Sequence, residues 1–256
     1  MIESKIGYST NDEIFVRGRS LTRELMGNID FTDMCLLEIT GEMPSREVKE
    51  TTNAILVMLS DHGLMPSVIA SRMTQLGAPE ALQGAVAAGI LGAGNHFLGT
   101  TQNAAEWLQA ATGGTTNLAP DRTEMLAAEA VARWRDFREP IAGLGHPLHK
   151  NGDPRSTKLF EIAEANGLCL GHCRLLERTQ LLLSEERGKF VPLNAAGAVG
   201  AVISDIGWKP VMARALSLIA RVPGLLAHLL EEIDNPQAEE MWGLVMRNST
   251  AFSLDE

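Results

Sequence analysis

The sequence is poor in cysteine and in aromatic residues. Three cysteines among 256 residues form an odd and sparse set, so we expect reduced thiols and no disulfide framework. A chain of this length can bury a sufficient core without cross-links. Aromatic residues make up 5% of the chain and hydrophobic residues 45%, which favours packed helices over a β-sandwich. We therefore predict an all-α fold.

Positive charge is also scarce. The chain has 22 Lys and Arg against 32 Asp and Glu, a formal net charge of −10, and no basic run occurs. This excludes a nucleic-acid surface, which needs clustered cations. The sequence shows no cationic segment followed by an apolar stretch at its start, and no run of about 18 uncharged apolar residues. We expect a cytoplasmic protein with no membrane or nucleic-acid partner.

Apolar residues recur at the spacing of helices in several windows. These windows are 47–59, 66–73, 102–111, 122–135, 156–165 and 210–233. Pro223 inside the last window predicts a kink or a break. Periodicity is lost after it, so 235–256 is predicted to be a tail. We expect two lobes that share buried helices: a large helical domain of 1–112 and 192–256, and a small helical domain of 113–191.

The stretch GLGHPLHKNGDPR, residues 143–155, concentrates groups that could bind a ligand. Gly143 and Gly145 allow the backbone to approach a ligand closely. Asp153 and the proline after it can end the loop and start a helix. His146 is thereby presented on a loop and not on a helix face.

This stretch resembles the signature of the citrate synthase family. Other stretches resemble further family motifs in the same order: VRGRSLTREL at 16–25, LLEITGEMPSREV at 36–48, SDHG at 60–63 followed by Arg72, and IARVPGLLAHLLE at 219–231. The short length and the DHG motif are similar to citryl-CoA lyases and to the lyase domain of ATP-citrate lyase. The resemblance implies a citrate synthase-like fold of two helical domains and a homodimer or higher homo-oligomer.

The implied activity is cleavage or formation of the C–C bond between an acetyl-CoA unit and oxaloacetate or a related 2-oxo acid. Coenzyme A would enter as a thioester substrate, with a di- or tricarboxylate as the second ligand. No covalently bound cofactor and no metal are implied. The chemistry needs a group that exchanges the hydroxyl proton and donors that stabilise an enolate oxygen.

The resemblance also assigns roles to individual residues. The catalytic set is His146, His62 and His96. The residues expected to hold carboxylates, to which a forked guanidinium is suited, are Arg155, Arg221 and Arg72. The residues expected to contact coenzyme A are Lys150, Lys189, Gly143, Gly145 and Asn151.

One family position departs from the pattern. Where the family carries the Asp that moves a proton at the acetyl methyl carbon, this chain has Ala196. Three explanations stay open: little activity, replacement by another acid such as Asp205, or a different reaction. Asp205 lies nine residues further on, roughly 13 Å along a helix, a distance that argues against the second explanation. The alternative function is a protein that binds a CoA ester or citrate with little or no turnover.

Two other histidines have simpler interpretations. The CLGHC stretch at 169–173 offers three potential zinc ligands without a fourth, so it does not make a closed structural site. His228 lies among leucines and is predicted to be a core histidine with its hydrogen bonds satisfied.

Overall fold

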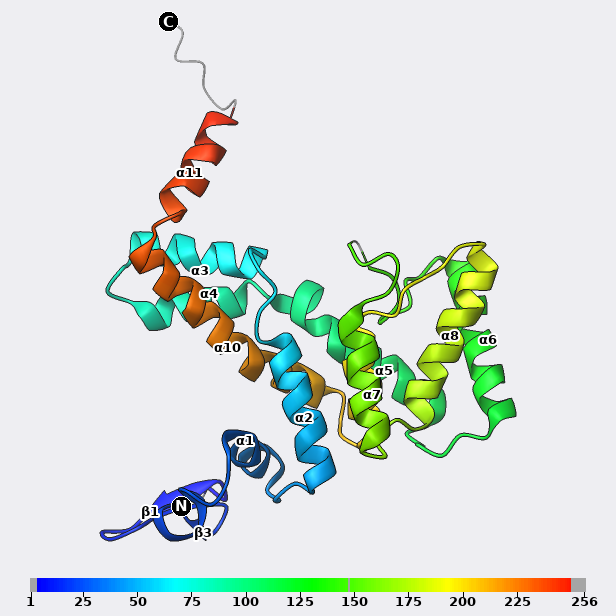
Figure 1. The fold of residues 1–256 in the computed structure, drawn as a ribbon, viewed down its shortest axis with the longest axis horizontal. Helices are drawn as coiled ribbons and strands as arrows, with labels where there is room; N and C mark the ends of the chain where they lie inside the picture. The colour runs from blue at the N-terminus through cyan, green and yellow to red at the C-terminus, as the bar shows by residue number, and fades with distance from the viewer. Residues whose placement is uncertain (1–3, 147, 250–256) are drawn as a thin grey trace, which may run out of the picture.

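The protein is described from a computed structural model that covers residues 4–146 and 148–249. Within that part of the chain it consists of eleven α-helices, two short π-helical turns and one small sheet (Figure 1). The all-α prediction is confirmed, and each predicted window falls on a helix. The helices are α1 (Phe31–Thr40), α2 (Arg46–Leu59), α3 (Pro66–Gly77), α4 (Leu82–Leu91), α5 (Gly99–Thr112), α6 (Pro120–Phe137), α7 (Pro154–Ala165), α8 (Gly171–Arg187), α9 (Ala195–Asp205), α10 (Val211–Asp234) and α11 (Ala238–Arg247).

The sheet lies near the N-terminus and was not predicted. Strands β1 (Gly7–Ser9), β2 (Ile14–Val16) and β3 (Arg19–Ser20) pair antiparallel in the order β1-β2-β3. The π-helical turn η1 (Leu21–Leu25) follows it directly. The strands are too short to give a clear alternating pattern.

Helix α9 lies at the centre of the main core. Of its residues, all but one are buried, and it packs against α5, α7, α8 and α10. Small residues make this possible: a Cβ on Gly200 would lie 2.7 Å from the Cβ of Ala104 on α5. The close approach brings the two helices, and the loops at their N-terminal ends, to one place.

Helix α10 is a long helix that runs from α3 and α4 to the middle of the molecule, near α2 and α5 (Figure 1). It is continuous across Pro223, so the expected break is wrong. In the described part of the chain it is the one helix whose length and composition would allow it to cross a membrane, and 44% of its apolar window is buried. Because it contacts α2, α3, α4, α5 and α9, it is placed as a core helix of the fold.

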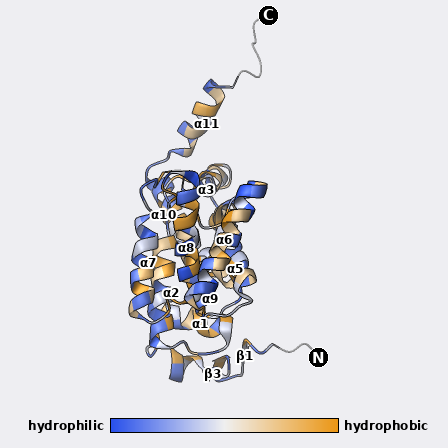
Figure 2. Cartoon of the chain, turned by 90° about the vertical axis from the view of Figure 1, so that its right-hand side faces the viewer, coloured by the Kyte–Doolittle hydropathy of each residue, from blue (hydrophilic) through white to orange (hydrophobic). Residues whose placement is uncertain are grey.

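The predicted C-terminal tail is wrong for residues 238–247, which form α11. The cap of this helix is supplied from α10: Glu232 Oε1 accepts hydrogen bonds from the backbone N–H groups of Gln237 and Ala238, each at 2.8 Å. Helix α11 extends away from the other helices, at the end opposite the sheet (Figures 1 and 2). The division into a large and a small domain stays a prediction.

Candidate active site

Residues 143–146 are joined to the segment that leads into α9. The backbone N–H of Gly145 donates to the carbonyl of Pro192 at 2.7 Å, and that of Asn194 donates to the carbonyl of Gly143 at 3.0 Å. The Asn194 side chain donates to the carbonyl of Gly145 at 2.8 Å and caps α9 by accepting from the N–H of Gly197 at 3.0 Å. The predicted loop is thus held by both backbone and side-chain bonds.

Two glycines let this loop lie against α9. Gly143 has φ of +96°, and a Cβ on it would lie 2.6 Å from the Cα of Gly197. A Cβ on Gly197 would lie equally close to the carbonyl oxygen of Gly143. Since both clashes involve backbone atoms, neither position has room for a side chain.

His146 follows this contact, and its ring orientation is fixed from one side. Its Nδ1 accepts hydrogen bonds from the backbone N–H groups of Leu148 and His149, at 3.1 and 2.9 Å. Nδ1 therefore carries a lone pair, and Nε2 carries the proton of the neutral ring. Burial lowers the pKa of the His146 imidazole, and the positive charge of neighbouring side chains lowers it further. The charge of Asp153 raises this pKa, but the net pKa lies below its usual value. His146 is thus a neutral Nε2–H donor.

A cavity of about 350 Å³ collects residues from five separate parts of the chain. Its volume is within the range of small-molecule sites. Five ionisable residues line it: His62, His96, His146, Arg155 and Arg221. Among the described residues that line the cavity there is no Asp or Glu. The chemistry of the walls is therefore that of an anion site.

Arg155 is held by a buried carboxylate at the start of α7. Its Nε and Nη2 donate to Asp153 at 3.0 and 2.9 Å, a bidentate pair that fixes the guanidinium plane. Asp153 also accepts from the backbone N–H of Ala195 at 3.1 Å. Burial raises the pKa of the Asp153 carboxyl, but the charge and hydrogen bonds of Arg155 and the N–H of Ala195 together hold the net pKa below its usual value.

Arg221 has no such carboxylate partner. It is 8% exposed, and its Nη1 is buried without a hydrogen-bond partner among the described residues. Burial lowers the pKa of its guanidinium, Asp61 raises it and Arg155 lowers it, yet an arginine stays protonated. A buried cationic donor without an acceptor is costly, and a ligand carboxylate would satisfy it.

His62 and His96 reach the cavity from two short connections. His62 lies between α2 and α3, in a loop where Gly63 adopts φ of +69°. His96 lies in the π-helical turn η2 (Gly94–Leu98), which a hydrogen bond from Arg214 Nη2 to Asn95 Oδ1, at 2.6 Å, ties to α10. Such turns are frequent at functional sites.

The prediction that Arg72 binds a substrate carboxylate is wrong in this structure. Arg72 does not line the cavity, its side chain is 1% exposed, and its Nη1 donates to Glu232 at 2.6 Å. Its Nη2 pairs with Glu231 and lies 3.0 Å from Nδ1 of His228. The sequence places Arg72 ten residues after His62, but this spacing does not indicate that its side chain points to α10.

The expected coenzyme A contacts fall into two groups. Gly145 lines the cavity. Gly143 is buried against α9, where close packing leaves no room for a side chain. Lys150, Asn151 and Lys189 are exposed and do not line the cavity, so their contact with coenzyme A stays a prediction.

Ala196 lines the cavity in the first turn of α9, and Asp205 is not placed to replace a carboxylate there. Asp205 is 5% exposed and its oxygens accept from three backbone N–H groups at the start of α8, at 2.7 to 3.0 Å. It also bonds Nδ1 of His172 at 2.8 Å, whose Nε2 lies 2.9 Å from the Thr112 hydroxyl. His172 and Asp205 are therefore structural.

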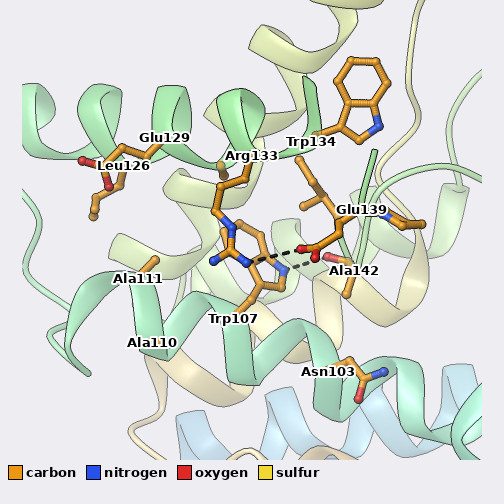
Figure 3. Close-up of a pocket in the computed structure, with 13 residues that line it drawn as sticks. Asn103, Trp107, Ala110, Ala111, Leu126, Glu129, Arg133, Trp134, Glu139 and Ala142 are labelled. Atoms are coloured by element: carbon orange, nitrogen blue, oxygen red, sulfur yellow. Dashed lines mark hydrogen bonds and ion pairs between the residues drawn. The ribbon is translucent and has the colours of Figure 1, made fainter. Parts of the chain in front are cut away.

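A second cavity, of about 380 Å³, lies between α5 and α6 and contains none of the predicted catalytic residues. Figure 3 shows Trp107 and the ion pair of Arg133 and Glu139 in it. The indole N–H of Trp107 donates to the carbonyl of Ala142 at 2.8 Å. This bond holds the residue that immediately precedes the loop of His146.

Two α10 residues line the cavity, Ser217 and Arg221; sequence reasoning named Arg221 and missed Ser217. Five polar or small residues recur along this helix at spacings of three and four: Arg214, Ser217, Arg221, Gly224 and His228. At 100° per residue they lie within an arc of roughly 80°. Such spacing in an otherwise apolar helix is a signal that could have found the set.

Comparison with known proteins gives matches over most of the chain. A family model described as citrate synthase, C-terminal domain, matches residues 3–245. Citrate synthase 2 of Bacillus subtilis is 27% identical over 205 residues, which are 78% of this chain and 51% of that protein. Citrate synthase of Haloferax volcanii is 26% identical over 209 residues, again 78% and 51%. The chain spans about half the length of these two relatives.

Solved structures cover the chain more completely. Citryl-CoA lyase from Hydrogenobacter thermophilus has a TM-score of 0.80 and 30% identity, with 92% of this chain and 88% of that chain covered. ATP citrate lyase from Methanothrix soehngenii, solved with citrate and coenzyme A, has a TM-score of 0.73 and 20% identity, with 91% and 39% covered. The second likeness concerns the fold alone.

Proposed function

Since this chain belongs to the citrate synthase family, we propose that its cavity binds a citryl-CoA-like thioester and cleaves or forms the C–C bond between an acetyl-CoA unit and oxaloacetate or a related 2-oxo acid. The observation that carries the proposal is the unpartnered Arg221 in a cavity with Arg155 and three histidines. Two guanidinium groups suit a ligand with at least two carboxylates.

His146 would act on the oxygen that changes between hydroxyl and carbonyl. In cleavage the C–C electron pair moves to the acetyl-CoA carbon, the hydroxyl loses its proton and becomes the 2-oxo acid carbonyl, and the methyl carbon gains a proton. Because Nδ1 of His146 accepts from two backbone N–H groups, the ring presents Nε2–H to this oxygen and would donate a hydrogen bond to the negative charge that develops on it. The net reaction moves one proton from the hydroxyl to the methyl carbon through solvent. His62 would contact the same ligand, and His96 is the candidate donor to the thioester carbonyl.

Proton transfer at the methyl carbon is the step for which the cavity offers no suitable side chain among the described residues. Ala196 cannot exchange a proton, and no carboxylate lines the described cavity. This observation favours the second candidate function, a member of the family that binds a CoA ester or citrate with little turnover. The two functions share one ligand site and differ in rate alone.

The test is to supply citryl-CoA and follow the release of acetyl-CoA and oxaloacetate. The first function predicts turnover by the unaltered protein, which Ala196→Asp increases by roughly 10²- to 10⁴-fold, the typical contribution of a placed acid or base. Turnover detected in Ala196→Asp alone would support the binding function instead. No turnover and no citrate or CoA binding in either protein would refute both. A homodimeric state and a cytoplasmic location stay predictions.

A further inference from the structure

The loop that carries His62 is in contact with α10 at two points. A Cβ on Gly224 would lie 2.1 Å from the carbonyl oxygen of Ser60, so the helix touches the loop backbone directly. One turn further along the helix, Nε2 of His228 lies 3.0 Å from Oδ1 of Asp61. Asp61 is the residue before His62, and its other oxygen accepts from the N–H of Gly63 at 3.0 Å. Asp61 thus holds the backbone on both sides of His62.

The hydrogen-bond partners of His228 define its tautomer. Nδ1 lies 3.0 Å from Nη2 of Arg72. A guanidinium donates hydrogen bonds and cannot accept them, so Nδ1 of His228 is the acceptor. The ring proton is then on Nε2, where it is donated to the carboxylate of Asp61.

Arg72 is itself fixed by α10. Its Nη1 donates to Glu232 Oε2 at 2.6 Å and its Nη2 pairs with Glu231. Glu232 is 6% exposed and caps α11 with its other oxygen. The side chain of His228 is 16% exposed. Arg72 and Glu232 are buried, whereas the carboxylates of Glu231 and Asp61 are half-exposed. Bonds among the buried members favour one arrangement of the network.

We propose that His228 is a positioning residue, which donates from Nε2 to Asp61 and thereby places the adjacent His62 at the cavity, in a tautomer set by Arg72. The cavity residues Arg221 and His62 are then held by one helix, since Arg221 and His228 lie two turns apart on the same stripe of α10. The proposed effect on catalysis rests on the proposed function. The tautomer and the placement of His62 do not.

The first arm of the test is nitrogen NMR of the protein with ¹⁵N-labelled histidine. The chain has six histidines, and single substitutions assign each ring. The proposal predicts a pyridine-type Nδ1 and a protonated Nε2 for His228. Replacing Arg72 with Met should remove this preference. A protonated Nδ1 in the unaltered protein would overturn the proposal.

The second arm compares His228→Leu with His228→Gln. The glutamine amide can still donate to Asp61, whereas leucine cannot. We expect the His62 ring resonances to shift in His228→Leu and in Asp61→Ala, and to stay close to those of the unaltered protein in His228→Gln. Leu230→Gln, at an exposed position of the same helix, is the matched control. An unmoved His62 resonance in folded His228→Leu would overturn the proposal.

Kinetics form the third arm, with citryl-CoA as substrate. Misplacing a reacting group by about 1 Å can cost roughly 100-fold, so kcat should fall by about 10- to 100-fold in His228→Leu, with less change in KM and rescue in His228→Gln. The double variant with Asp61→Ala should lose no more than the larger single loss, because both act through one contact. Additive losses would contradict the proposal. Absence of turnover in the unaltered protein would instead refute the enzymatic function proposed above and leave the NMR result to decide.

Discussion

Two arginines line the same cavity, and replacing each by methionine should change stability in opposite directions. Arg221 keeps a buried Nη1 without a partner, whereas Arg155 neutralises the fully buried carboxylate of Asp153. Arg221→Met removes an unsatisfied buried donor, which costs about 1 to 3 kcal/mol. Arg155→Met leaves a buried charge uncompensated, which costs about 3 to 5 kcal/mol.

These free energies translate into melting temperatures. For a chain of this size 1 kcal/mol shifts Tm by about 2 to 4 °C. Without ligand, Arg221→Met should therefore melt about 2 to 12 °C higher than the unaltered protein, and Arg155→Met clearly lower. Differential scanning calorimetry in a buffer without carboxylates or phosphate measures both.

The more stable variant, Arg221→Met, should bind citrate more weakly than the unaltered protein. A charge-assisted hydrogen bond contributes about 1.5 to 3 kcal/mol, so Arg221→Met should weaken citrate binding by roughly 10- to 150-fold, measured by titration calorimetry. A lower melting temperature of Arg221→Met than of the unaltered protein, both without ligand, would refute this prediction. That result would mean that the guanidinium is already satisfied within the fold.

Three further predictions concern stability, each measured by urea unfolding. The pKa of His146 is lowered from 6.5 in the folded chain, so the unfolded state takes up the proton first as the pH falls. The free energy of unfolding should therefore decrease below about pH 6.5, and decrease less in His146→Asn. A difference in stability between the unaltered protein and His146→Asn that does not change with pH would contradict this. Gly197→Ala should lower the free energy of unfolding by about 2 to 3 kcal/mol, because its Cβ would lie 2.6 Å from Gly143 backbone atoms. An unchanged free energy of unfolding would show that the loop does not pack against α9. Glu232→Ala should cost about 3 to 5 kcal/mol by leaving buried Arg72 short of a partner, and a loss under 1 kcal/mol would refute that role.

The sequence predicted best where structure depends on near neighbours. Helical spacing located the six helices that it named, and the glycines of 143–145 predicted the loop that presents His146 at the cavity. The cavity also brings together His62, His146, Arg155 and Arg221, which lie far apart in the chain. The resemblance to a family predicted this convergence. Spacing alone could not predict it, because spacing carries no information on contacts between distant parts of the chain.

The failures concern groups whose partners lie elsewhere in the fold. Helix α11 was missed since its cap, Glu232, belongs to the preceding helix. Arg72 was assigned to a carboxylate ligand, but its partners are carboxylates on α10. The break expected at Pro223 does not occur, because the tertiary contacts of α10 outweigh a local preference.

The central claim is that Arg155 and Arg221 hold the carboxylates of a ligand whose hydroxyl lies at Nε2 of His146. A crystal structure of the protein with citrate and coenzyme A tests it most directly. We expect citrate in this cavity, with one carboxylate on Nη1 of Arg221 and another at Arg155. Citrate bound elsewhere, with Nη1 of Arg221 still unpaired, would contradict it.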